Sequence, residues 1–242
     1  MGTPALRALG FSVSTSSQRG RVAVLSKAVA ESLPEVFQRD DFTCRYCGFR
    51  STQWQEVHRI DGQWEDDAPV TSVEDGETVC FLCHLVLHLD VAGEQRAGRL
   101  IWLPEIGQAA LHHIVRAIWV AQGVVGEPRT WAQSALGVLE SRVDEARKRL
   151  EVSPDPGILA DAISDLVGEL GRDGFDARRG QLAGLRLLPE KKLMRRDDKE
   201  SKNIIGEAVM FWRSADQGPY GKHLPKTWAD ELHKASAQLG IS

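Results

Sequence analysis

The chain contains 242 residues, of which 42% are hydrophobic and 26% are charged, a composition typical of a globular protein with a sizeable core. Its formal net charge of −4 gives no general attraction to nucleic acid or to anionic lipid. No segment reaches the roughly 18–20 consecutive apolar residues of a membrane span, and residues 1–20 lack the apolar stretch of a signal peptide. The composition therefore predicts a cytoplasmic protein that does not insert directly into a membrane.

The first predicted elements form a tail and a small metal-binding module. Residues 1–20 are rich in Gly, Ser and Thr, which predicts a disordered N-terminal tail. The module follows over residues 21–100, and a short helix over residues 27–39 leads into its first cysteine pair. Near its end, residues 98–103 form a short apolar run that Pro104 stops, so we expect a strand there.

A helical body is predicted over residues 101–189. Residues 108–122 carry apolar side chains at helical spacing, which predicts an amphipathic helix. Thr130, with Gln133 three residues later, matches a capping box that would open the next helix. Two further helices are predicted in this body, over residues 158–170 and 175–187.

The last segment, residues 190–242, opens with a run of charges of both signs that is typical of a solvated linker. Helical patterns return over residues 203–215 and 227–239, with a turn between them at residues 218–221. Taken together, the pattern predicts an α+β protein in which a zinc-bound module is followed by a mainly helical body.

All four cysteines fall in two Cys-x-x-Cys pairs, Cys44 with Cys47 and Cys80 with Cys83. In a reducing cytoplasm this spacing indicates a metal site rather than disulfides. Four thiolates aimed at one point give the tetrahedral sulfur coordination that Zn²⁺ accepts. Because such a site has no open coordination position, we expect one structural zinc ion and no catalysis by it. A redox-active Cys-x-x-Cys would explain one pair and leave the other unexplained.

The cysteine region resembles the HNH, or ββα-metal, endonuclease family. Zinc-containing members carry a Cys-x-x-Cys pair, a Val-His-His-Ile strand, an Asn loop, and a Cys-x-x-Cys-His sequence that opens a helix. The matching segments here are residues 44–48, 56–60 and 80–84. The resemblance implies an HNH-like ββα module around the zinc ion. It also implies that His58 and His84 would be the catalytic residues if the chain were a nuclease.

The resemblance fails at the residue that would perform the chemistry. The second histidine of the family's pair is the general base, and Arg59 stands at that position, where it cannot accept a proton. Asp75 replaces the family's Asn, and a one-residue shift of the alignment would let His58 act as the base. His58, His84 and His88 could hold a second metal ion, although the sequence favours a role in packing or capping the zinc site.

The local charge also argues against nucleic acid as a partner. Residues 40–90 contain three Lys or Arg residues and eleven Asp or Glu residues, which leaves a formal charge of −8. DNA binding needs cationic side chains to replace phosphate counterions, so an acidic face would repel the backbone. Such a face could attract a basic peptide, although an acidic run is often solvated surface.

A narrower family resembles more of the chain, across residues 35–195 with gaps. The run Phe37-Gln-Arg-Asp-Asp-Phe-Thr-Cys44-Arg-Tyr-Cys47-Gly-Phe49 is similar to the DotN/IcmJ component of type IVB (Dot/Icm) secretion systems. So are the run Gly98-Arg-Leu-Ile-Trp-Leu-Pro-Glu105 with the helix after it, and Leu185-Arg-Leu-Leu-Pro189. His58, His84 and His88 make this sequence more HNH-like than that family, and residues 203–242 have no matching counterpart.

This second resemblance implies a non-enzymatic zinc-binding adaptor in the coupling complex of a secretion system. Its partners would be the C-terminal extension of a DotL-like coupling ATPase and the other coupling-complex subunits, without nucleic acid. The protein would then be cytoplasmic and peripheral to the inner-membrane secretion complex. Two other functions stay open: an HNH endonuclease that cleaves DNA with a divalent metal, and a zinc-ribbon protein that binds nucleic acid.

Overall fold

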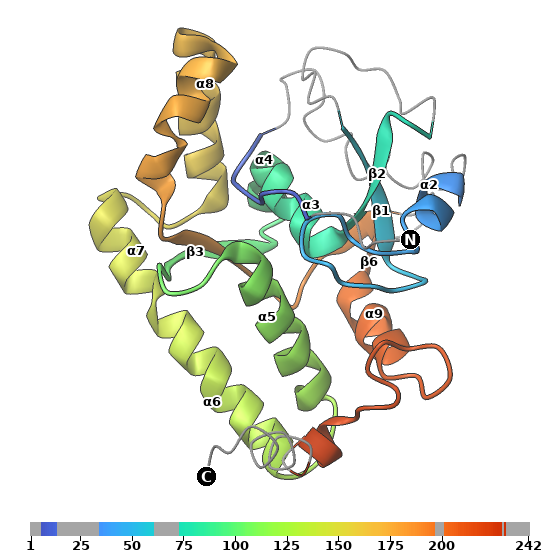
Figure 1. Ribbon diagram of the computed structural model, residues 1–242. Coiled ribbons are helices and arrows are strands. Elements are labelled where there is room, and N and C mark those ends of the chain that lie inside the picture. The colour runs from blue at the N-terminus through green and yellow to red at the C-terminus, as the bar shows by residue number, and fades with distance from the viewer. Residues whose placement is uncertain (1–5, 14–33, 61–72, 197–200, 229, 231–242) are drawn as a thin grey trace, which may run out of the picture.

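A computed structural model describes residues 6–13, 34–60, 73–196, 201–228 and 230 (Figure 1). The predicted helix start at residues 27–33 and most of the predicted helix over residues 227–239 lie outside the described residues. Residues 6–13 correct the prediction of a disordered tail for that stretch. Phe11 and Val13 are buried there, and the segment is bonded to the module because Ser12 N–H donates to the Val86 carbonyl.

The module around the cysteines follows the order helix, strand, strand, helix. The described part of the first helix is α2 (Pro34–Arg39), and the strands are β1 (Gln55–Arg59) and β2 (Gly76–Cys80). The strands pair antiparallel, with His58 opposite Glu77, and every residue of β2 is buried. Helix α3 (Phe81–Leu87) follows β2 without a loop, so Cys80, the last residue of the strand, occupies the N-cap position without a side-chain hydrogen bond to the helix.

Strand β3 (Gly98–Trp102) confirms the predicted strand, but its partner was not predicted. It pairs antiparallel with β4 (Leu185–Pro189), which occupies part of the predicted helix over residues 175–187. The prediction holds for residues 175–178, which end helix α8 (Pro156–Arg178), and is wrong beyond them because residues 179–182 form a short 3₁₀ turn and Gly184 then takes a positive φ of 99°. The division of the chain at residues 100 and 189 stays a prediction.

Four helices make up most of the remaining body. Helix α5 (Gln108–Gln122) has the predicted bounds and packs against α6 (Glu127–Ser141). Helix α6 begins before Thr130, because Pro128 occupies the first turn, so the predicted capping box is wrong. Helix α7 (Val143–Leu150) contacts β3, and α8 (Pro156–Arg178) packs beside α4 (Leu89–Glu94), as Figure 1 shows.

The C-terminal part returns to the module. Strands β5 (Met194–Arg196) and β6 (Ser201–Asn203) form a third antiparallel pair, and helix α9 (Ile204–Trp212) starts directly after them. The Asn203 side chain accepts a hydrogen bond from Ile205 N–H and thereby caps α9. A short 3₁₀ turn at Pro225–Thr227 is followed by Trp228 and Asp230, the last described residues of the chain.

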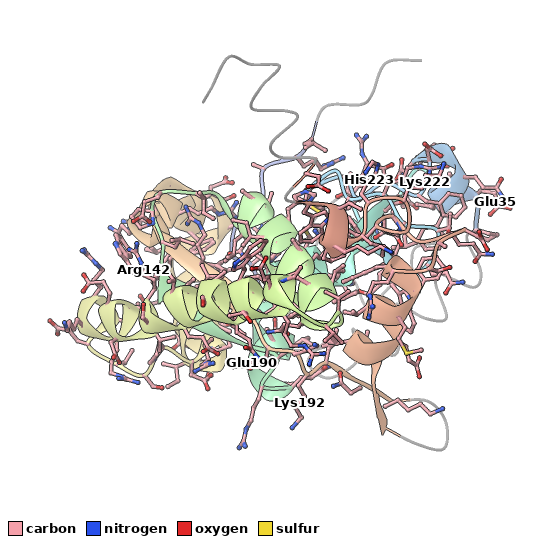
Figure 2. All side chains as sticks on the ribbon, turned by 90° about the horizontal axis from the view of Figure 1, so that it is seen from below. Glu35, Arg142, Glu190, Lys192, Lys222 and His223 are labelled. Carbon is pink, nitrogen blue, oxygen red and sulfur yellow. The ribbon has the colours of Figure 1, made fainter. Side chains whose placement is uncertain are left out.

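One hydrophobic cluster runs from the cysteine module into the helical body and α9. Charged and polar side chains, including the labelled Arg142, Glu190 and Lys192, project outward around it (Figure 2). Within the described part of the chain, none of the helices combines the length and apolar character needed to cross a membrane. The mixed helix and sheet content confirms the predicted α+β class.

The turn before β4 should be sensitive to substitution. Gly184→Ala would force an L side chain into a positive φ and place its Cβ about 2.5 Å from the Trp102 ring. We expect a loss of roughly 1–3 kcal/mol in the free energy of unfolding, measured by denaturant titration. Gly137→Ala is the matched control, because it lies in open space on α6 and should stabilise the protein by about 0.5–1 kcal/mol. Equal effects of the two substitutions would contradict this account.

Candidate metal centre

The four cysteines come together from two parts of the chain. Cys44 and Cys47 lie on the loop after α2, Cys80 ends β2, and Cys83 is in the first turn of α3. All four side chains are buried, and their sulfur atoms lie within 4.8 Å of one another. The Sγ atoms of Cys47 and Cys80 are 3.7 Å apart. This arrangement of the four predicted ligands is compatible with a single zinc ion.

The loop that carries the first pair is shaped by its backbone. Gly48 takes a positive φ of 73°, and its N–H donates to the Cys44 carbonyl at 2.9 Å, which closes a tight knuckle. Cys44 N–H in turn donates to the Phe49 carbonyl. Arg45 N–H donates to the carbonyl of Thr78 on β2, so the knuckle is held against the strand that supplies the third ligand.

The donor set suits a divalent metal ion. Burial raises the pKa of the Cys80 and Cys83 thiols, although the Arg116 guanidinium acts in the opposite direction on Cys80. A zinc ion would bind these sulfurs as thiolates and stabilise their negative charge. The four sulfurs would fill its tetrahedral shell, so the ion would hold the loop, β2 and α3 together and leave no position for a substrate.

Sequence reasoning missed the side chains of α5 that reach this centre. His112 and Arg116 are fully buried and lie beside the cysteine sulfurs, and His113 Nε2 contacts the Cys47 carbonyl at 2.7 Å. The available signal was a histidine and an arginine four residues apart on the same side of an otherwise apolar helix. Residues four positions apart share one face of a helix, so we expect the two side chains to be buried together when that face packs against the module.

Three histidines of the module form a second cluster. His58 comes from β1, His84 from α3, and His88 from the junction between α3 and α4. Their coordinating nitrogen atoms lie within 4.8 Å of one another. The ring centroids of His84 and His88 are 4.6 Å apart, and His58 lies 5.4 Å from each. The structure therefore brings together the three histidines that the sequence named for a second metal ion.

Burial favours the neutral form of two of these histidines. Burial lowers the pKa of His58 to about 3 and also places the pKa of His88 well below its usual value. Neutral imidazoles are the form that binds metals. Glu56 Oε2 lies 2.5 Å from His84 Nδ1, which leaves Nε2 as the coordinating atom of that ring. Three imidazoles would leave a metal ion with an open position.

Arg59 does not contribute to this cluster. It follows His58 directly on β1, and successive strand residues point to opposite faces. Asp75, at the family's Asn position, lies just before β2, where its carbonyl accepts a hydrogen bond from Ile60 N–H. The three histidines therefore have the geometry of metal ligands. The position of the expected general base holds Arg59 instead of a histidine.

Comparison with known proteins found one informative relative. The chain is 26% identical over 163 residues to the type 4 apparatus protein DotN of Legionella pneumophila. The alignment covers 67% of this chain and 73% of that protein. No protein-family model matches the chain. The similarity agrees with the resemblance seen in the sequence and connects the chain to a component of a type IV secretion apparatus.

The cysteine cluster makes a direct prediction about stability. Cys83→Ser should abolish high-affinity zinc binding and unfold the module, because structural zinc contributes on the order of 10 kcal/mol in small domains. Circular dichroism and metal analysis of the purified protein check both effects. Ser134→Ala, an exposed substitution on α6, serves as the control. A Cys83→Ser protein that keeps its native spectrum after chelation would contradict a structural metal.

Proposed function

We propose that this protein is a non-enzymatic zinc-binding adaptor subunit in the coupling complex of a Dot/Icm-like type IV secretion system. The observation that carries the proposal is the similarity to the type 4 apparatus protein DotN. The order β1, β2, α3 around a cluster of four cysteines supports an HNH-like zinc module as its scaffold. Arg59 at the position of the general base supports a scaffold that performs no hydrolysis.

The partners of this adaptor are the C-terminal segment of a DotL-like coupling ATPase and the other coupling-complex subunits. In this role the protein is cytoplasmic and peripheral to the inner-membrane complex, and it binds no nucleic acid. Helix α6 offers a face for an apolar partner segment. Trp131 and Val138 are 52% and 61% exposed and lie two helical turns apart on the same side. Exposed tryptophan is a frequent anchor at protein interfaces.

Native purification of the tagged full-length protein from its own host tests this proposal. We expect stoichiometric recovery of a large coupling ATPase, unchanged when the lysate is treated with nuclease. A Trp131→Ser, Val138→Ser double variant should lose most of that ATPase. Val152→Ser, which alters an apolar residue 48% exposed elsewhere, should retain it. Recovery of DNA alone, lost on nuclease treatment, would refute the adaptor.

The three-histidine cluster favours a second candidate function, an HNH endonuclease. His58, His84 and His88 could hold a divalent metal ion beside DNA, and Glu56 orients the His84 ring. An ion held there would act as a Lewis acid on a phosphodiester. This candidate needs a group that activates water, and Arg59 cannot act as that base. We therefore rank it second.

A plasmid-nicking assay separates the two functions. We expect no nicking by the unaltered protein with magnesium, manganese or nickel, because Arg59 cannot accept a proton. Arg59→His restores an imidazole at that position and tests whether the base is the missing part. Metal-dependent nicking by the unaltered protein that disappears in His58→Ala would make the endonuclease the correct function.

A further inference from the structure

Helix α5 places a completely buried arginine against the cysteine cluster. The Arg116 guanidinium has no solvent exposure, and its Nη2 lies 2.7 Å from Cys80 Sγ and 3.5 Å from Cys47 Sγ. The guanidinium carbon also lies 4.1 Å from the centre of the Phe49 ring. Among the described residues, Nε and Nη1 of this arginine have no hydrogen-bond partner. Its charge is therefore balanced by the sulfurs and the aromatic face.

A second donor from the same helix reaches a third sulfur. His112 Nδ1 lies 3.3 Å from Cys83 Sγ, and His112 Nε2 lies 2.8 Å from Gln108 Nε2. The Gln108 amide is fixed because its oxygen accepts from Leu187 N–H while its Nε2 donates to the Leu187 carbonyl, each at 2.8 Å. Gln108 Nε2 is thus a donor to His112 Nε2. The proton of His112 must then sit on Nδ1, facing Cys83.

We propose that Arg116 and His112 are positioning residues that form the outer coordination shell of the metal centre, with Gln108 setting the tautomer of His112. The proposal rests on the zinc centre proposed above. Together the two side chains donate to Cys47, Cys80 and Cys83. Because Gln108 is bonded to Leu187, this shell also links the centre to β4, which is more than a hundred residues away from the cysteines in the sequence.

These donors stabilise the centre because an ion bound by four thiolates would carry a net negative charge. A divalent ion with four thiolates carries a net charge of −2, and a buried anion is stable only where cations or donors face it. Arg116 reduces that charge to −1, and the His112 N–H donates to another sulfur. The same arginine should therefore stabilise the metal-bound protein, in which the sulfurs are thiolates that face its guanidinium at hydrogen-bond distance.

The experiment compares the full-length protein with Arg116→Met, which keeps the length of the side chain and removes its charge. Zinc affinity is measured by competition with a chromophoric chelator, and thermal unfolding is followed with zinc and after chelation. We expect Arg116→Met to bind zinc about 10–100-fold more weakly, the usual effect of losing an outer-shell partner. Its unfolding midpoint should fall by more with zinc present than after chelation.

Two further variants keep the comparison informative. Arg116→Lys retains the charge without the planar fork and should give an intermediate affinity, and it replaces Arg116→Met if that variant does not fold. Arg147→Met, in an exposed ion pair on α7, should leave zinc affinity unchanged. Equal zinc affinity in all variants, or equal loss of stability with and without zinc, would assign Arg116 to ordinary packing and overturn the inference. If the unaltered protein itself binds no zinc, the proposed zinc centre fails as well.

Discussion

The convergence of four cysteine sulfurs on one point is the interaction on which the rest of the structure depends. The loop after α2 supplies one pair, β2 and α3 supply the other, and α5 closes over them with Arg116. These segments also meet in the main hydrophobic cluster, which includes the four cysteines and most of α3. A metal ion bound by the sulfurs would add to that stabilisation, because its binding energy is also folding energy for the segments that carry its ligands.

The same module carries the cysteine cluster and the three-histidine cluster. The cysteine cluster is enclosed, so an ion bound there would hold α3 against the end of β2. Helix α3 also carries His84, and strand β1, which pairs with β2, carries His58, so such an ion would also hold these histidines in place. Loss of the cysteine site should therefore abolish the histidine site, whereas loss of the histidine site need not disturb the cysteines.

Local sequence patterns predict the cysteine cluster and most of the helices. They do not predict contacts between residues that are far apart in the sequence. The cysteine spacing predicted the cluster, and the periodicity of residues 108–122 predicted α5 with its observed bounds. The leucines of strand β4 suit either a helix or a strand, and only pairing with β3 decides between the two structures. Arg116 interrupts an apolar helix in the sequence, and no local rule indicates that a thiolate cluster lies opposite it.

The formal charge counted from the module's sequence differs from the charge that its surface presents. Asp40 is paired with Arg39, Asp41 with Arg50, Glu56 with His84 and Glu77 with Arg7. Each of these four acids is paired with a basic side chain, although Asp41 stays exposed, and four others among the eleven fall in residues 61–72, outside the described residues. The formal charge of −8 therefore does not translate into an acidic face that excludes DNA. The case against a nuclease rests on chemistry instead, because an arginine cannot take the proton that hydrolysis must remove.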